Sequence, residues 1–188
     1  MGKQSWKAGN MLNPVPAVMV SVADQNHRPN IITVAWAGTV CTNPPMVSIS
    51  VRPSRYSYEI IEKTGEFVIN LTNEKLAKPV ITAAWSAEEM WINLKNRTYT
   101  GSGGACESSG NCGKSCKYCL QVGGEPSAWQ SYDVCGGSTW RNGDDAYLDE
   151  TGKFDINGTG LIMYSHGEYF ALGKKLGKFG YSVQKKKK

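Results

Sequence analysis

The chain has 188 residues, enough for one domain with a sizeable core, and its net charge of +5 comes mostly from the run Lys185–Lys188. Hydrophobic residues make up 40% and charged residues 20%, which excludes a disordered chain. No apolar run is long enough to span a membrane, the polar N-terminus lacks a signal-peptide core, and no basic stripe with interleaved aromatics indicates nucleic-acid binding. We therefore expect one cytoplasmic, globular domain that covers residues 1–188.

Short β-branched and apolar runs separated by turn residues dominate the regular parts of the chain. The expected strands are residues 15–23, 30–38, 46–51, 66–71 and 160–164. One short helix lies among them: Ser57 is the expected N-cap and Gly65 ends the helix. Closely spaced strands with a single helix predict an antiparallel barrel rather than a βαβ fold.

The strongest local signal for a binding site is the turn between the third strand and this helix. Arg52 and Arg55 offer bidentate hydrogen bonds to phosphate oxygens, and the first amides of the helix carry partial positive charge. Ser50, Tyr56 and Ser57 add hydroxyl groups to the same stretch. The pattern fits a phosphate site and, about equally well, an ordinary surface turn before a capped helix.

Two weaker candidates lie elsewhere in the chain. The strand from Asn30 to Trp36 offers polar groups at Asn30 and Thr33 and one aromatic wall to a flat ring, although a half-buried tryptophan in a barrel strand is the better explanation by spacing alone. His166 sits beside Gly167 near the C-terminus, where a lone histidine is more often a structural hydrogen-bonding group than an acid or base.

Several segments in a fixed order carry a resemblance to a known family. They are Trp6–Leu12, Asn30–Trp36, Pro45–Pro53, Arg55–Ser57, Thr64–Leu71, Tyr164–Tyr169 and Leu176–Gly180. Together they resemble the flavin reductase-like family, which includes the flavoredoxins, over about residues 5–78 and 144–184.

The resemblance implies a mainly β fold, an FMN-binding split β-barrel of Greek-key-like topology with a few short helices. It also implies a homodimer with FMN near the subunit interface. By the same resemblance, the isoalloxazine ring lies along Asn30, Thr33, Val34, Ala35 and Trp36, and His166 is a further cofactor-binding residue. Ser50, Arg52, Arg55, Tyr56 and Ser57 then surround the phosphate end.

The expected function is that of an FMN-dependent oxidoreductase that transfers electrons from NAD(P)H to the flavin. No GxGxxG fingerprint is present, so the nicotinamide is expected to stack directly on the flavin rather than occupy a separate Rossmann site. The alternative is a flavoredoxin-type electron carrier that is not an enzyme. No residue is assigned a catalytic role from the sequence.

Residues 79–143 do not fit the pattern of the flanking sequence, and no barrel strand is expected there. This segment is rich in Gly, Ser, Cys and Trp. Synonymous codons for these residues can be chosen so that a shifted reading frame again gives a sequence that resembles the family. The shifted frame starts at the third base of each codon over Val80–Asn96. It starts at the second base over Cys106–Cys119 and Ala128–Trp140. Three single-base losses within the segment would add up to one codon, so that the original frame resumes at Asp144. We therefore interpret the segment as translated out of frame.

The cysteines of that segment allow another interpretation. Cys106, Cys112, Cys116 and Cys119 include one pair with the spacing of a zinc or iron–sulfur site. The other gaps are irregular, and a shifted frame explains the cysteines without a metal. A cysteine-rich metal-binding module is thus a remote alternative, and we expect no metal.

Overall fold

The computed structural model describes residues 2–26, 28–85, 117–122, 132–142, 147–179 and 181. Most of its regular structure is strand. The strands are β1 (Val15–Pro16), β2 (Val18–Ala23), β3 (Pro29–Val34), β4 (Ala37–Cys41), β5 (Met46–Val51), β6 (Glu66–Leu71), β7 (Lys117–Val122), β8 (Tyr132–Asn142), β9 (Ile162–Ser165) and β10 (Glu168–Ala171). The helices are α1 (Tyr56–Thr64), α2 (Ala77–Trp85) and the 3-10 turns η1 (Glu74–Leu76) and η3 (Ile156–Thr159). None of the described helices is both long and apolar enough to cross a bilayer.

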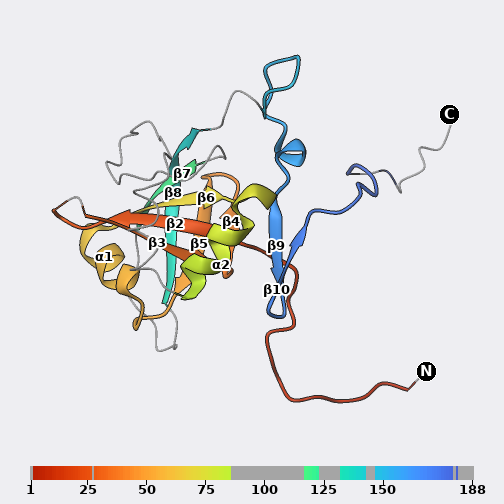
Figure 1. Cartoon of the computed structure of the whole chain (residues 1–188), viewed down its shortest axis with the longest axis horizontal. Helices are drawn as coiled ribbons and strands as arrows, with labels where there is room; N and C mark the ends of the chain where they lie inside the picture. The colour runs from red at the N-terminus through yellow and green to blue at the C-terminus, as the bar shows by residue number, and fades with distance from the viewer. Residues whose placement is uncertain are drawn as a thin grey trace.

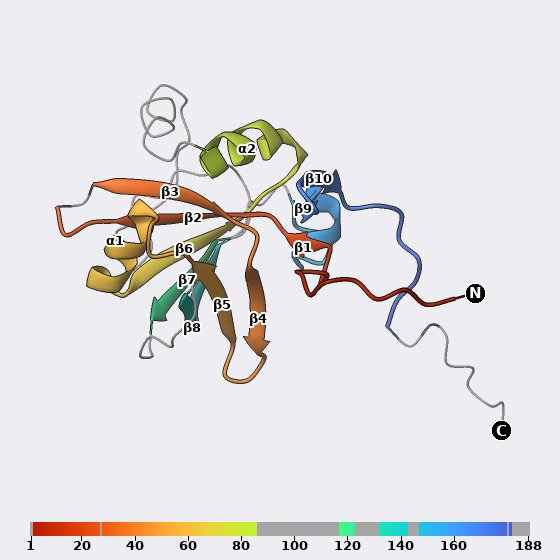
Figure 2. The same cartoon turned by 90° about the horizontal axis from the view of Figure 1, so that it is seen from below.

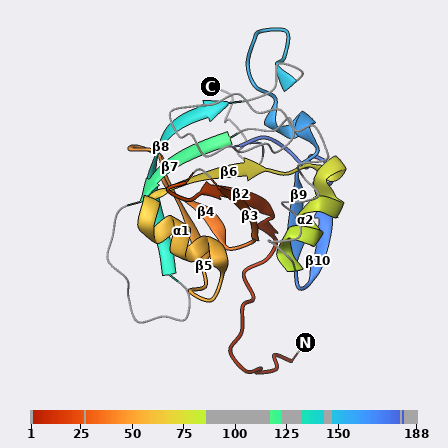
Figure 3. The ribbon, with the colours of Figure 1, turned by 60° about the vertical axis from the view of Figure 1, so that its left-hand side comes forward.

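Seven of these strands form one antiparallel sheet in the order β3-β2-β6-β7-β8-β5-β4. Its two edge strands, β3 and β4, are consecutive in the chain and are joined only by Ala35 and Trp36. Two residues can link opposite edges only if the sheet curls until those edges approach each other, which makes the sheet a barrel (Figure 3). We call the two-residue link Ala35–Trp36 the seam.

The strands β2 and β3 are buried on both faces because the barrel interior lies on one side and α2 on the other. Val18, Val20 and Val22 face the interior, where they pack with Phe67 and with Ile60 of α1, whereas Met19 packs under α2. The three-stranded sheet β1-β9-β10 lies at the end of the barrel away from α1 (Figures 1 and 2).

The predicted elements agree closely with the structure in three places. The strands predicted at residues 46–51 and 66–71 have these bounds, and the helix ends at Gly65, whose positive φ of 70° suits a residue without a Cβ. The strand predicted over residues 30–38 is wrong as a single strand, because the chain leaves one sheet edge at Val34 and joins the other at Ala37.

The expectation that residues 79–143 contribute no barrel strand is also wrong. Strands β7 and β8 lie in that segment and pair in register with β6 and β5. The backbone explains this: without them, β6 and β5 would each present an unpaired row of amides and carbonyls, which any extended chain can satisfy. The stretches that hold Cys106, Cys112 and Cys116 lie outside the described residues.

Candidate functional site

The seam carries one partly exposed aromatic side chain, that of Trp36. The Trp36 carbonyl accepts a hydrogen bond from the backbone amide of Ser50 at 2.8 Å, which ties the seam to the end of β5. The Trp36 side chain is 39% exposed, so one part of the indole remains available to a ligand. Ser50 lies two residues before Arg52, and the seam is therefore adjacent to the arginine turn.

The strand β3 does not present a row of ligand-facing side chains. Val34 is buried in the barrel core, and the Thr33 hydroxyl donates to the Val80 carbonyl of α2 at 2.7 Å, on the opposite face. Ala35 is half-buried at the seam. Among the residues predicted to line a flat ring, Ala35 and Trp36 are therefore the two whose side chains are neither buried in the core nor hydrogen-bonded to α2.

Asn30 and Ser57 are brought together, but in the core. The Asn30 side-chain amide donates to Ser57 Oγ at 2.8 Å, and the two residues are 3% and 1% exposed. The expected N-cap role of Ser57 is wrong: Arg55 is the N-cap, and Ser57 lies in the first turn with its side chain turned inward. This hydrogen bond joins the start of β3 to the start of α1 and so fixes the helix against the barrel.

The arginine turn has the features of an anion site. Arg52, Arg55 and Tyr56 are all exposed, and the Arg55 amide donates to the Arg52 carbonyl at 3.0 Å to close the turn. No side chain caps the first turn of α1. Within the described part of the chain, no carboxylate forms an ion pair with either guanidinium. Two unpaired cations beside a helix N-terminus favour a bound anion such as a phosphate group.

His166 occupies a different part of the molecule. It lies in the turn between β9 and β10 with a φ of 47°, and its Nε2 is 3.4 Å from Asn13 Nδ2. Figures 1 and 2 both show this turn on the side of the barrel away from α1. Nearby, Tyr169 packs edge-on against Tyr164, and burial raises the pKa of the Tyr169 phenol, which therefore stays neutral. A single chain does not bring His166 to the arginine turn.

Comparisons with known proteins show which family and which fold this chain resembles. Residues 11–98 match the model of the flavin reductase like domain, past Lys78, where the resemblance was expected to stop. The uncharacterized protein YddH of Escherichia coli K12 is 40% identical over 63 residues, which cover 33% of this chain and 33% of that protein. The matching part of the chain thus covers about a third of the length of that curated relative.

Two solved structures share the fold over nearly the whole chain. The flavoredoxin of Desulfovibrio vulgaris (Miyazaki F) has a TM-score of 0.85 at 24% identity, covering 97% of this chain and 100% of its own. An FMN-binding protein from Thermus thermophilus, solved with bound 1-cyclohex-2-enone, has a TM-score of 0.72 at 16% identity, covering 94% and 99%.

The fold is therefore the split barrel of the flavin reductase-like proteins, as predicted from the sequence. Residues 11–98 match the flavin reductase like domain, and the predicted resemblance is confirmed. This match supports a flavoprotein or a flavin-related oxidoreductase as the class of protein.

Proposed function

We propose that this protein binds FMN and transfers electrons from NAD(P)H to the flavin. The observation that carries the proposal is the arginine turn: Arg52 and Arg55 are exposed, lack described carboxylate partners and stand at an uncapped helix N-terminus next to the seam. The phosphate group of FMN would lie at this turn, with Tyr56 beside it. The flavoredoxin and the FMN-binding protein that share the fold support the choice of cofactor.

The ring end of FMN is proposed to lie at the seam. Trp36 would offer its exposed part to the isoalloxazine, with Ala35, Val34 and Thr33 forming the strand behind it. Asn30 and Ser57 would act from the core, because their mutual hydrogen bond holds β3 and α1 in position. Ser50 fixes the seam through its amide. Flavin would supply the hydride chemistry, and the chain would supply position and electrostatics.

A homodimer in the cytoplasm is part of the proposal, with His166 reaching the cofactor only across the subunit interface. Both terminal segments leave the barrel near the three-stranded sheet (Figure 2). They carry large exposed apolar side chains: Trp6 is 81% exposed, Leu12 86% and Leu176 89%. Apolar side chains of this size favour burial against another surface. The chain has a mass of 20.5 kDa. Light scattering after size-exclusion chromatography should give twice that mass, and a monomer would contradict this part of the proposal.

The experiment that tests the function separates a reductase from a carrier. Purified protein should be yellow with flavin absorbance, and under anaerobic conditions it should oxidise NADH or NADPH when FMN is present. Bound FMN without any turnover would favour the alternative, a flavoredoxin-type carrier that is not an enzyme, which the likeness to the Desulfovibrio flavoredoxin supports. A folded protein that takes up no added FMN would contradict both.

A further inference from the structure

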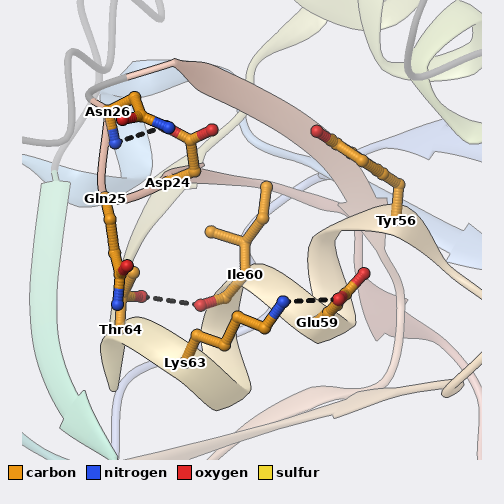
Figure 4. Close-up of a pocket in the computed structure, with 8 residues that line it drawn as sticks. All are labelled: Asp24, Gln25, Asn26, Tyr56, Glu59, Ile60, Lys63 and Thr64. Atoms are coloured by element: carbon orange, nitrogen blue, oxygen red, sulfur yellow. Dashed lines mark hydrogen bonds and ion pairs between the residues drawn. The ribbon is translucent and has the colours of Figure 1, made fainter.

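A cavity of about 200 Å³ lies between α1 and the turn that joins β2 to β3 (Figure 4). One wall is the face of α1 that carries Tyr56, Glu59, Ile60 and Lys63, which are three or four residues apart and so lie on one side of the helix. Gln25 comes from the turn on the opposite side. Nothing in the proposed FMN site uses this cavity except its neighbour Tyr56.

Most polar groups around the cavity already have partners. Asp24 Oδ1 accepts from the backbone amides of Asn26 and Arg28, each at 2.8 Å. The ammonium group of Lys63 donates to Glu59; this hydrogen bond lowers the pKa of Glu59 and raises that of Lys63, so both are charged at neutral pH. Among the described residues, no hydrogen bond engages the Gln25 carboxamide or the Tyr56 hydroxyl, and these two groups remain for a ligand.

The volume of the cavity fits one heterocycle. An engineered apolar cavity of about 150 Å³ holds a benzene molecule, whereas sites for complete drug-sized ligands are on the order of 300–1,000 Å³. Figure 4 shows Ile60 between the side chains of Tyr56 and Gln25. Ile60 offers an apolar floor, the Tyr56 ring offers a stacking surface, and a glutamine carboxamide matches the N6 and N7 edge of adenine.

We propose that this cavity holds the adenine ring of an adenine nucleotide whose 5′-phosphate side lies at the arginine turn. The inference depends on the phosphate site proposed above, because Tyr56 directly follows Arg55 and so connects the turn to the cavity. FAD and NADH both carry this adenosine phosphate. The carboxylates of Asp24 and Glu59 outnumber the single ammonium of Lys63, which disfavours the additional 2′-phosphate of NADPH.

The test compares FMN, FAD, AMP and adenosine 2′,5′-bisphosphate as probes on the full-length protein freed of flavin. Flavin binding is followed by fluorescence quenching and nucleotide binding by calorimetry. A Gln25→Ala variant should bind AMP at least about fivefold more weakly than the parent, since a bidentate carboxamide contact to a base is worth about 1–3 kcal/mol. Adenosine 2′,5′-bisphosphate should bind more weakly than AMP to the parent.

The flavin arm of the test identifies the source of the nucleotide. If FAD binds more tightly than FMN and Gln25→Ala removes the difference, the adenine belongs to the flavin cofactor. If FAD and FMN bind equally while AMP binding depends on Gln25, the adenine belongs to NADH. Gln4→Ala, a change in the exposed N-terminal segment, is the matched control and should alter neither.

Two negative results have different meanings. Retained FMN binding with no preference for FAD and no detectable AMP binding would overturn the adenine site and leave the proposed function standing. Failure to bind FMN would instead contradict the proposed function. Gln25 is exposed in a turn, so its replacement leaves the barrel core intact and the result interpretable.

Discussion

The double variant Arg52→Ala/Arg55→Ala should lose at least about a hundredfold in FMN affinity. A hydrogen bond to a charged group contributes about 1.5–3 kcal/mol, and each guanidinium can supply at least one to the phosphate. Among the described residues, no carboxylate forms an ion pair with either arginine. The double variant therefore breaks no ion pair in that part of the chain. Fluorescence titration with FMN measures the loss directly.

The matched control for this variant removes two lysines instead. Lys75 and Lys78 are exposed in η1 and α2, away from the arginine turn, so Lys75→Ala/Lys78→Ala changes net charge equally. The control should bind FMN nearly as the parent does. Riboflavin, which lacks the phosphate, should bind the parent and the arginine variant with similar affinity. Unchanged FMN affinity in the arginine variant would remove the phosphate assignment, whatever riboflavin does.

Restoring the proposed reading frame between Lys78 and Asp144 should strongly stabilise the protein. The frame hypothesis requires one base to be reinserted at each of three places: near Lys78, between Asn96 and Ala105, and within the stretch from Arg141 to Asp144. The restored sequence permits the apolar run Met-Phe-Val where the present β8 has Asp133, Val134 and Cys135. Each large apolar side chain that becomes buried contributes about 1.5–3 kcal/mol.

Urea denaturation measures the stability change. The free energy of unfolding should rise by on the order of 5 kcal/mol, since several such side chains would enter the barrel at once. A gene with the same number of bases inserted as a single codon after Gln184 is the control, because it adds one residue without altering the frame of the barrel. Equal stability of the restored and present proteins would contradict the hypothesis that the segment is out of frame.

Local features of the fold were predictable from the sequence because their signals are local. The alternation in Met46–Val51, the bounds of Glu66–Leu71 and the glycine after α1 each depend on a few neighbouring residues. The pairing of β5 with β8 was not predictable, since their register depends on residues more than 80 positions apart in the chain. Segments β7 and β8 are strands because β6 and β5 need backbone hydrogen-bond partners. The amino-acid pattern of β7 and β8 themselves does not indicate a strand.

The candidate site shows the same division. The arginine turn was predictable because all of its groups lie within Ser50–Ser57. The inward turn of Ser57 was not, because the partner that draws it into the core, Asn30, is 27 residues away. The place of Gln25 in the cavity was not predictable, since it depends on how α1 packs against the turn between β2 and β3. No pattern in the sequence indicates that cavity.

The two-residue seam makes one short stretch of this protein unusually intolerant of length variation. Surface loops accept additional residues at a small entropic cost. One residue added between Val34 and Ala37, however, would displace β4 by a position relative to β5 and turn its inward side chains outward. Homologous chains should therefore differ in length at the turns around the barrel and keep the spacing between these two edge strands constant.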